Sequence, residues 1–174
     1  MFGSTLKRGF SPTAVALAGL VLAFAVLAPS AAVAKQGGTD RPIAAKQSGT
    51  NVIDVASGAY VIDATGTESH LGKVTAHYTG VATPTGPNTL SISGSSVEVA
   101  ANGDKLYATH SGSATLDAAF NAQGTLVNTI TGGTGRFENA SGVETGTFSM
   151  QTRSFDGVTL TSAISLSLAG SISY

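Results

Sequence analysis

The C-terminal run from Val158 to Tyr174 is the feature that most restricts what this chain can fold into. Apolar side chains recur at every second position of one parity, and Thr or Ser holds most of the other. Because successive side chains of a β-strand point to opposite faces, the run predicts strand structure with one apolar and one hydroxylic face. At about 3.4 Å per residue it exceeds a usual strand, so we expect a bend or bulge at Ser162 or Gly170.

The same alternation continues upstream, and helical spacing is absent from Arg41 onward. Strands are predicted at residues 41–50, 59–69, 72–84, 91–101, 104–114, 118–131, 143–153 and 157–174. Eight strands joined by short turns favour an all-β domain over residues 41–174, an eight-stranded antiparallel up-and-down β-barrel that leaves no exposed sheet edge. A β-sandwich is the alternative.

Two turns are distinctive. Asn102-Gly103 predicts a two-residue type I′ turn, because that turn needs a positive φ at both central positions. The stretch Ile130–Gly142 contains four glycines and predicts a structural corner between two strands. Within it, we expect Phe137 to be a packing anchor. We expect Arg136 to pair with Glu138 or Glu144, or to cap the barrel mouth.

Residues 1–34 have the pattern of a signal peptide. Lys7 and Arg8 precede an apolar run from Ala14 to Ala28, and Ala32-Val33-Ala34 offers a small-x-small cleavage site. The run is shorter than the roughly 20 residues that span a bilayer, so a retained membrane anchor is the weaker alternative. We therefore expect cleavage after Ala34, a flexible lead-in at residues 35–40, and a secreted or periplasmic protein.

Composition excludes several partners and chemistries. Residues 1–34 hold two of the nine basic residues and no acidic residue, so the remaining chain has seven basic and ten acidic residues, a net charge of about −3. Nucleic acid and an anionic membrane surface both favour basic patches, so neither is an expected partner. The chain has no cysteine, and its stability cannot depend on disulfides.

The interior parity predicts a cavity lined partly by aromatic rings. The predicted ligand-binding residues are Tyr60, Tyr78, Phe120, Phe148 and Tyr174. Small residues of the same parity leave room beside them, namely Ala64, Ala76, Ala108 and Ala122. A closed barrel lined in this way can hold one small ligand.

Three polar residues are weak catalytic candidates: Glu68, His110 and Tyr78. His110 follows the parity of Leu106 and Ala108, and could act as an acid or base near neutral pH. Glu68 has the parity of Tyr60 and Ile62, which places it at a barrel mouth, although an acid in such a position more often faces water.

No motif dictates a reaction. The histidines at 70, 77 and 110 lack the close spacing of metal ligands, so no metal site is predicted. Gly133 and Gly135 are not followed by the Lys-Ser/Thr ending of a phosphate loop. No serine lies in a Gly-x-Ser-x-Gly elbow and no cysteine is available as a nucleophile, which disfavours hydrolysis.

The glycine corner, with Ala140-Ser141-Gly142 after it, resembles the glycine-rich hairpin of the allene oxide cyclase and dirigent group of calycin-like barrels. The stretches 69–73, 100–104 and 170–174 are similar to those of small secreted bacterial proteins with this barrel. The resemblance implies an eight-stranded barrel with an apolar cavity, no cofactor, and a tendency to form homotrimers. It carries over no catalytic residue.

Three functions follow as hypotheses. The first is a secreted, cofactor-free barrel that binds a small apolar or amphipathic molecule. The second is an isomerase or cyclase of the allene oxide cyclase type, or a dirigent-like protein, in which the cavity shapes a reactive substrate. The third is a structural or surface-interaction protein, which a closed interior and a flat, exposed hydroxylic face would favour.

Overall fold

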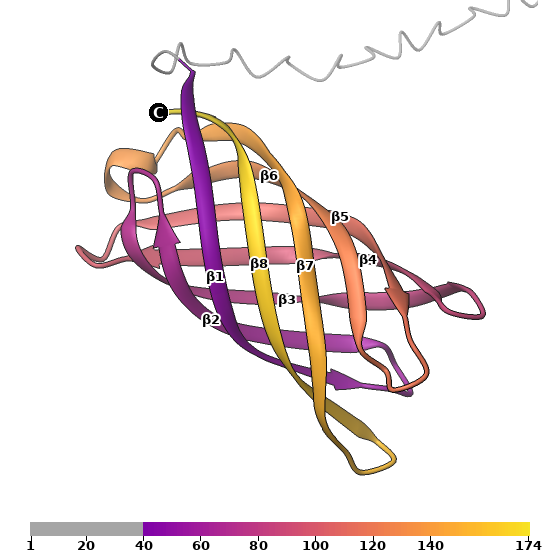
Figure 1. Ribbon diagram of the computed structural model, residues 1–174. Helices are drawn as coiled ribbons and strands as arrows, with labels where there is room; N and C mark the ends of the chain where they lie inside the picture. The colour runs from indigo at the N-terminus through magenta and orange to yellow at the C-terminus, as the bar shows by residue number, and fades with distance from the viewer. Residues whose placement is uncertain (1–39) are drawn as a thin grey trace, which may run out of the picture. The chain divides into compact units, whose positions relative to one another are not determined.

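The structure, a computed structural model, describes residues 40–174 (Figure 1). Eight strands close into one barrel in which each pairs antiparallel with the next and β8 pairs with β1. The strands are β1 (Arg41–Asp54), β2 (Ala59–Glu68), β3 (Gly72–Gly86), β4 (Thr89–Ala100), β5 (Lys105–Leu116), β6 (Ala122–Gly133), β7 (Ser141–Phe155) and β8 (Thr159–Ser173). The predicted up-and-down barrel is therefore confirmed, and the sandwich alternative is wrong. The predicted signal peptide and residues 35–39 lie outside the described residues.

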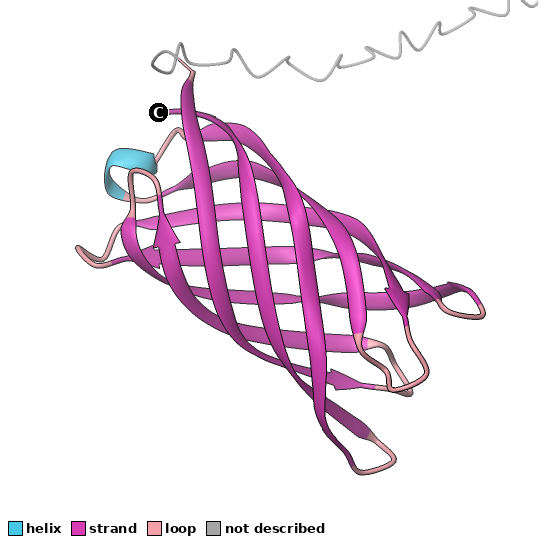
Figure 2. Cartoon of the chain, in the orientation of Figure 1, coloured by secondary structure: helices cyan, strands magenta, loops and turns pink. Residues whose placement is uncertain are grey.

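Strand parity separates the interior of the barrel from its outer wall. Along β8, for example, Leu160, Ile164 and Leu168 are buried, whereas Ser165 and Ser167 are exposed. Figure 2 shows that strands make up nearly the whole wall. Among the described residues, no helix has the length and apolar character needed to cross a membrane.

The C-terminal run differs from the prediction in one respect. Strand β8 is a single strand whose pairing with β1 continues without a shift and whose pairing with β7 is regular at Gly170, so the bend or bulge expected at Gly170 is wrong. The register of the β7–β8 pair does shift at Ser162, as expected, but the extra residue belongs to β7: Thr152 pairs with Ser162 and Ser154 pairs with Thr161.

Inward-facing glycines allow the strands to close into a narrow barrel. On every strand, the Cβ of a side chain at one such glycine would lie 1.8–2.3 Å from a carbonyl oxygen of a neighbouring strand. These positions are Gly49, Gly66, Gly80, Gly94, Gly112, Gly124, Gly146 and Gly170. Barrel closure needs strands to bend sharply, and glycine permits this close approach of two backbones.

The two ends of the barrel differ. At one end, which we call the closed end, Arg41 and Ile172 pair, and the 3-10 helix η1 (Gly135–Phe137) lies beside them (Figure 1). An apolar cluster fills this end, made of Ile43, Leu71, Val74, Ala100, Leu106, Ile130, Phe137, Ala140 and Ile172. The β1–β2, β3–β4, β5–β6 and β7–β8 hairpins form the opposite, open end.

The glycine corner becomes η1 and its flanking turns. Phe137 is fully buried, which confirms it as a packing anchor. The pairing predicted for Arg136 is wrong, because its Nε lies 3.6 Å from Asp104 Oδ2 and its guanidinium donates a hydrogen bond to the carbonyl of His70. Arg136 therefore ties the loops of the closed end together.

The turn at Asn102-Gly103 is also not the predicted type I′ turn. Gly103 has a φ of +88°, but among the described non-glycine residues only His70 and Phe120 have a positive φ. The backbone N–H of Ala100 donates a hydrogen bond to the carbonyl of Asp104 across a three-residue loop, and the Asp104 carboxylate closes the turn by accepting a hydrogen bond from the Asn102 side chain. A three-residue loop needs only one residue in the left-handed region, and Gly103 occupies that position.

Candidate functional site

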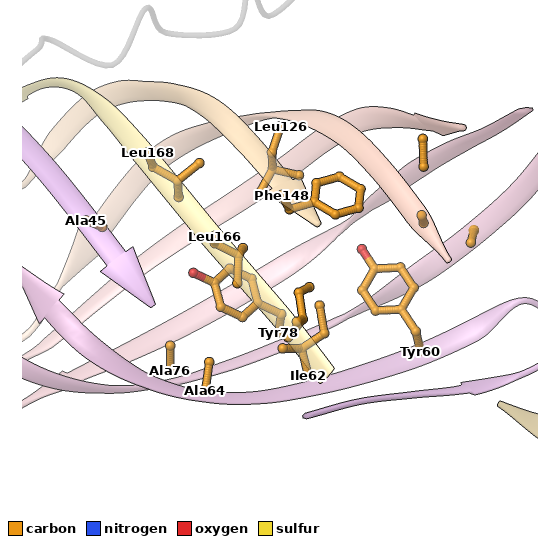
Figure 3. Close-up of a cluster of buried hydrophobic side chains, with 14 residues drawn as sticks. Ala45, Tyr60, Ile62, Ala64, Ala76, Tyr78, Leu126, Phe148, Leu166 and Leu168 are labelled. Carbon is orange, nitrogen blue, oxygen red and sulfur yellow. The ribbon is translucent and has the colours of Figure 1, made fainter. Parts of the chain in front are cut away.

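An apolar cavity lies inside the barrel on the side of the open end. Its volume is about 50 Å³, and the empty space including its solvent-open mouth is about 510 Å³. The cavity is lined by Asn51, Ile53, Tyr60, Ile62, Ala82, Leu90, Ile92, His110, Ala114, Leu126, Phe148, Met150, Ile164 and Leu166. Figure 3 shows the rings of Tyr60 and Phe148 among the side chains of this interior. The lining is therefore almost entirely hydrocarbon, with few polar groups.

Tyr60 and His110 form the main polar feature of the cavity wall. The Tyr60 hydroxyl lies 2.6 Å from His110 Nε2, a buried hydrogen bond between β2 and β5. Glycines on the strands between them make room for the pair, because a Cβ at Gly80 would lie 2.5 Å from the Tyr60 hydroxyl and one at Gly94 would lie 2.8 Å from Nε2. The inward-facing glycines thus shape the cavity as well as the barrel.

Burial keeps both members of this pair uncharged. It lowers the pKa of His110 below its ordinary value, and it raises the pKa of Tyr60 to about 12. At neutral pH the imidazole is therefore neutral, with one nitrogen as donor and the other as acceptor. The second nitrogen, Nδ1, is buried and has no hydrogen-bond partner.

A set of buried polar side chains, here called the polar belt, crosses the interior toward the closed end. It takes one residue from each strand from β1 to β7: Gln47, Glu68, Tyr78, Glu98, His110, Asn128 and Glu144. On β6, Asn128 lies between Leu126 of the apolar cluster around the cavity and Ile130 of the closed-end cluster. The belt thus separates two apolar clusters inside one barrel.

Glu98 is the hydrogen-bonding centre of the polar belt. Its Oε1 accepts a hydrogen bond from Gln47 Nε2 at 3.0 Å, and the Tyr78 hydroxyl lies 3.0 Å from the same oxygen. The Tyr78 hydroxyl is also 2.7 Å from Gln47 Oε1, and its ring packs edge-on against His110 with 5.7 Å between centroids. Tyr78 thus connects the wall of the cavity to the acids behind it.

The other two acids of the belt hold protons more tightly than usual. Burial raises the pKa of Glu68 well above its ordinary value, and the nearby carboxyl groups of Glu98 and Glu144 raise it further. Burial and then the charge of Glu98 raise the pKa of Glu144 to about 7, although the side chain of Asn128, its register partner on β6, opposes this shift. The interior therefore disfavours ionised carboxylates.

The structure brings some of the predicted site residues together and separates others. Tyr60, Phe148 and His110 line the cavity, whereas Tyr78 is buried behind it. Glu68 is buried in the polar belt, so the expectation that it faces water is wrong, and so is its placement at a mouth.

Two predicted aromatic lining residues lie elsewhere. Phe120 is 51% exposed at the open end, because Asp117 holds the β5–β6 turn and Phe120 takes a φ of +59° within it. Tyr174 packs on Phe137 at the closed end, with 4.9 Å between ring centroids, and its hydroxyl accepts a hydrogen bond from Arg41. Neither lines the cavity.

Sequence reasoning missed most of the polar belt and one polar residue of the cavity wall. The missed residues are Gln47, Asn51, Glu98, Asn128 and Glu144. Each has the inward parity of its strand, as Glu98 does between Ser96 and Ala100, so the alternation itself could have found them. They were missed because acids and amides usually face water, which favoured an outward assignment.

Neither a metal-binding cluster in the described residues nor a similarity to a known protein identifies a function. Across residues 40–174, no group of three or more His, Cys, Asp or Glu side chains is placed to hold a metal ion. Comparison with protein-family models, curated proteins and solved structures finds no match to this chain. The interior of the barrel is therefore the basis for the functional argument.

Proposed function

We propose that this protein binds a small apolar or amphipathic molecule in the cavity beneath the open end. The observation that supports this proposal is the cavity itself, which combines a hydrocarbon lining with one hydrogen-bonded polar pair and a mouth toward solvent. Small-molecule sites are typically apolar concavities with a few placed polar groups that fix the ligand's orientation.

The size of the cavity indicates how a ligand would enter. Its 50 Å³ is below the roughly 150 Å³ of a cavity that holds benzene, so the side chains around the mouth must move apart. Leu90, Ile92 and Met150 are only partly buried there. Met150 suits this movement because its unbranched side chain adapts its shape at low cost.

Filling the cavity tests the proposal. Ala114→Leu adds three carbon atoms to a buried position of the cavity wall, so we expect it to reduce the uptake of small apolar molecules at least tenfold. Ala169→Leu is the matched control, because Ala169 is exposed on the outer side of β8. Native mass spectrometry of the purified protein would report bound molecules, and NMR of the Ile62, Ile164 and Met150 methyl groups would report binding of added ones.

The outcome is decisive in either direction. The proposal would be contradicted if no bound molecule is found and no apolar compound shifts these methyl signals. Equal uptake by Ala114→Leu and Ala169→Leu would place binding outside the cavity.

The Tyr60–His110 pair favours a second candidate, an isomerase or cyclase. A neutral imidazole is a competent base and a phenol a competent acid, and the two groups share one hydrogen bond at the cavity wall. Apolar epoxides of the kind that allene oxide cyclases rearrange are suitable substrates. Tyr60→Phe and His110→Gln should each lower turnover about a hundredfold, measured by chromatography of the products. If the unmodified protein gives no product above the uncatalysed background, this candidate fails, although binding stands.

A further inference from the structure

The hydrogen-bonding capacity of the cavity wall indicates which head group a ligand carries. If the Tyr60 hydroxyl donates to His110 Nε2, the unpartnered Nδ1 carries a hydrogen and needs an acceptor. In the other tautomer Nε2 donates to the Tyr60 oxygen, and both Nδ1 and the phenol hydrogen then lack partners. A ligand hydroxyl both donates and accepts, so it can pair with Nδ1 in either tautomer.

No positive charge is available inside the barrel to hold an anionic head group. Every lysine and arginine among residues 40–174 is exposed on the outside of the barrel. The titratable groups that face the interior are Tyr60 and Glu68 on β2, Tyr78 on β3, Glu98 on β4, His110 on β5 and Glu144 on β7, while β1, β6 and β8 contribute none. None of these groups carries a positive charge at neutral pH, because carboxyl and phenol groups are never cationic and burial lowers the pKa of His110.

The turns around the mouth add negative charge. Asp54, Asp117 and Asp156 lie in or next to three of the four hairpin turns of the open end. Each carboxylate accepts hydrogen bonds within its own turn, which lowers its pKa and keeps it ionised. The ionised aspartates at the mouth and the buried acids behind the cavity therefore both disfavour binding of a ligand carboxylate.

From this arrangement we infer that the cavity takes an uncharged apolar alcohol and rejects the carboxylate of the same carbon skeleton. This inference rests on the proposed binding function and adds the class of ligand to it. A hydroxyl completes the hydrogen bonds of the Tyr60–His110 pair, whereas a carboxylate meets no cation and loses its hydration.

The size of the discrimination follows from the protonation of the rejected ligand. An aliphatic carboxyl has an ordinary pKa of about 4 to 5, so only the small neutral fraction at pH 7.5 can enter without burying a charge. We expect the carboxylate to bind at least about a hundredfold more weakly than the alcohol at this pH. Its affinity should rise about tenfold for each unit by which the pH falls toward 5.5.

The experiment compares hexan-1-ol, hexanoate and hexylamine on the full chain, with the methyl signals of Ile62, Ile164 and Met150 as the readout. Hexan-1-ol should saturate these shifts at concentrations where hexanoate and hexylamine produce none at pH 7.5. Tyr60→Phe should weaken hexan-1-ol binding about tenfold. The affinity of the Tyr60→Phe variant for hexane, measured in parallel, should stay within twofold of that of the unmodified protein, because hexane makes no hydrogen bond.

Each result has a defined meaning. If hexanoate or hexylamine binds as tightly as hexan-1-ol, the inferred ligand class is overturned while the cavity remains a binding site. If Tyr60→Phe weakens hexane and hexan-1-ol equally, the hydroxyl is not recognised and the inference is also overturned. If none of the compounds, hexane included, shifts the methyl signals, the proposed function itself fails and the inference fails with it.

Discussion

Gly146→Ala is expected to lower the free energy of unfolding by at least about 3 kcal/mol, the upper range for overpacking, or to prevent the barrel from closing. A Cβ at this position would lie 1.9 Å from the carbonyl oxygen of Ser167 and 2.8 Å from Leu168 Cα. Both contacts are with the backbone of β8, so no side-chain rotation can relieve them, and β7 and β8 would have to separate.

Gly86→Ala is the matched control for this prediction. A Cβ at Gly86 would meet only the side chain of Thr89, with Oγ1 at 2.7 Å, and that hydroxyl can rotate away. We expect this variant to stay within about 1 kcal/mol of the unmodified protein, in the range of ordinary surface changes. Urea denaturation followed by circular dichroism would compare the two, and equal midpoints would show that the close approach of β7 and β8 does not limit closure.

The second large effect concerns pH. Glu144 has a pKa of about 7 in the folded barrel, against an ordinary value of 4.5. Between these two pH values the folded state keeps a proton that the unfolded chain has lost, so the free energy of unfolding falls as the pH rises through this window. Glu68, whose pKa is raised further, extends the fall above pH 7.

Glu144→Gln should remove part of this pH dependence. The amide keeps the shape of the side chain, but it cannot ionise. We expect the variant to match the unmodified protein near pH 4.5 and to be about 1–3 kcal/mol more stable at pH 8. Denaturant unfolding at both pH values would measure this difference.

Glu138→Gln is the control for the loss of one carboxylate, because Glu138 is exposed after η1. It should change stability by no more than about 0.5 kcal/mol at either pH. A Glu144→Gln variant that is less stable than the unmodified protein at pH 8 would show that the ionised carboxylate is a stabilising member of the polar belt.

The alternation of side chains was sufficient to predict the barrel, because period-2 patterning over eight sequential segments reflects burial of one face of each strand. It could not predict local irregularities. Of the two positions where we expected a bend or bulge, the pairing of β8 with β7 shifts at Ser162 through an extra residue on β7 and is regular at Gly170, where an added Cβ would lie 1.8 Å from the Val143 carbonyl oxygen.

Side-chain parity also fails to predict orientation for a residue in the turn before a strand begins. Phe120 has the inward parity of β6, but that strand begins only at Ala122. The carboxylate of Asp117 accepts hydrogen bonds from the backbone N–H groups of Ala119 and Asn121, at 2.8 and 2.9 Å, and this turn directs Phe120 outward. The hydrogen bonds of the Asp117 side chain determine this turn. A two-residue pattern of apolar side chains carries no information about such hydrogen bonds.

The site was only partly predictable for a different reason. Tyr60, His110 and Phe148 were placed correctly because their side chains suit an interior position. Glu98 and Glu144 have the same inward parity but a strong general preference for water, and their burial depends on neighbours from other strands, such as Gln47, which donates a hydrogen bond to Glu98. Such pairings depend on the register between strands that are distant in sequence.

The position of the C-terminus at the closed end has a practical consequence for any assay of this protein. Strand β1 begins at Arg41 and strand β8 ends at Ser173, both at the closed end and opposite the hairpins of the open end (Figure 1). A tag or linker attached after Tyr174 would therefore anchor the protein to a sensor chip with its cavity facing the flowing sample. Immobilisation through a residue engineered into the β7–β8 hairpin would present the opposite orientation, and the two surfaces should differ in how fast they load the same compound.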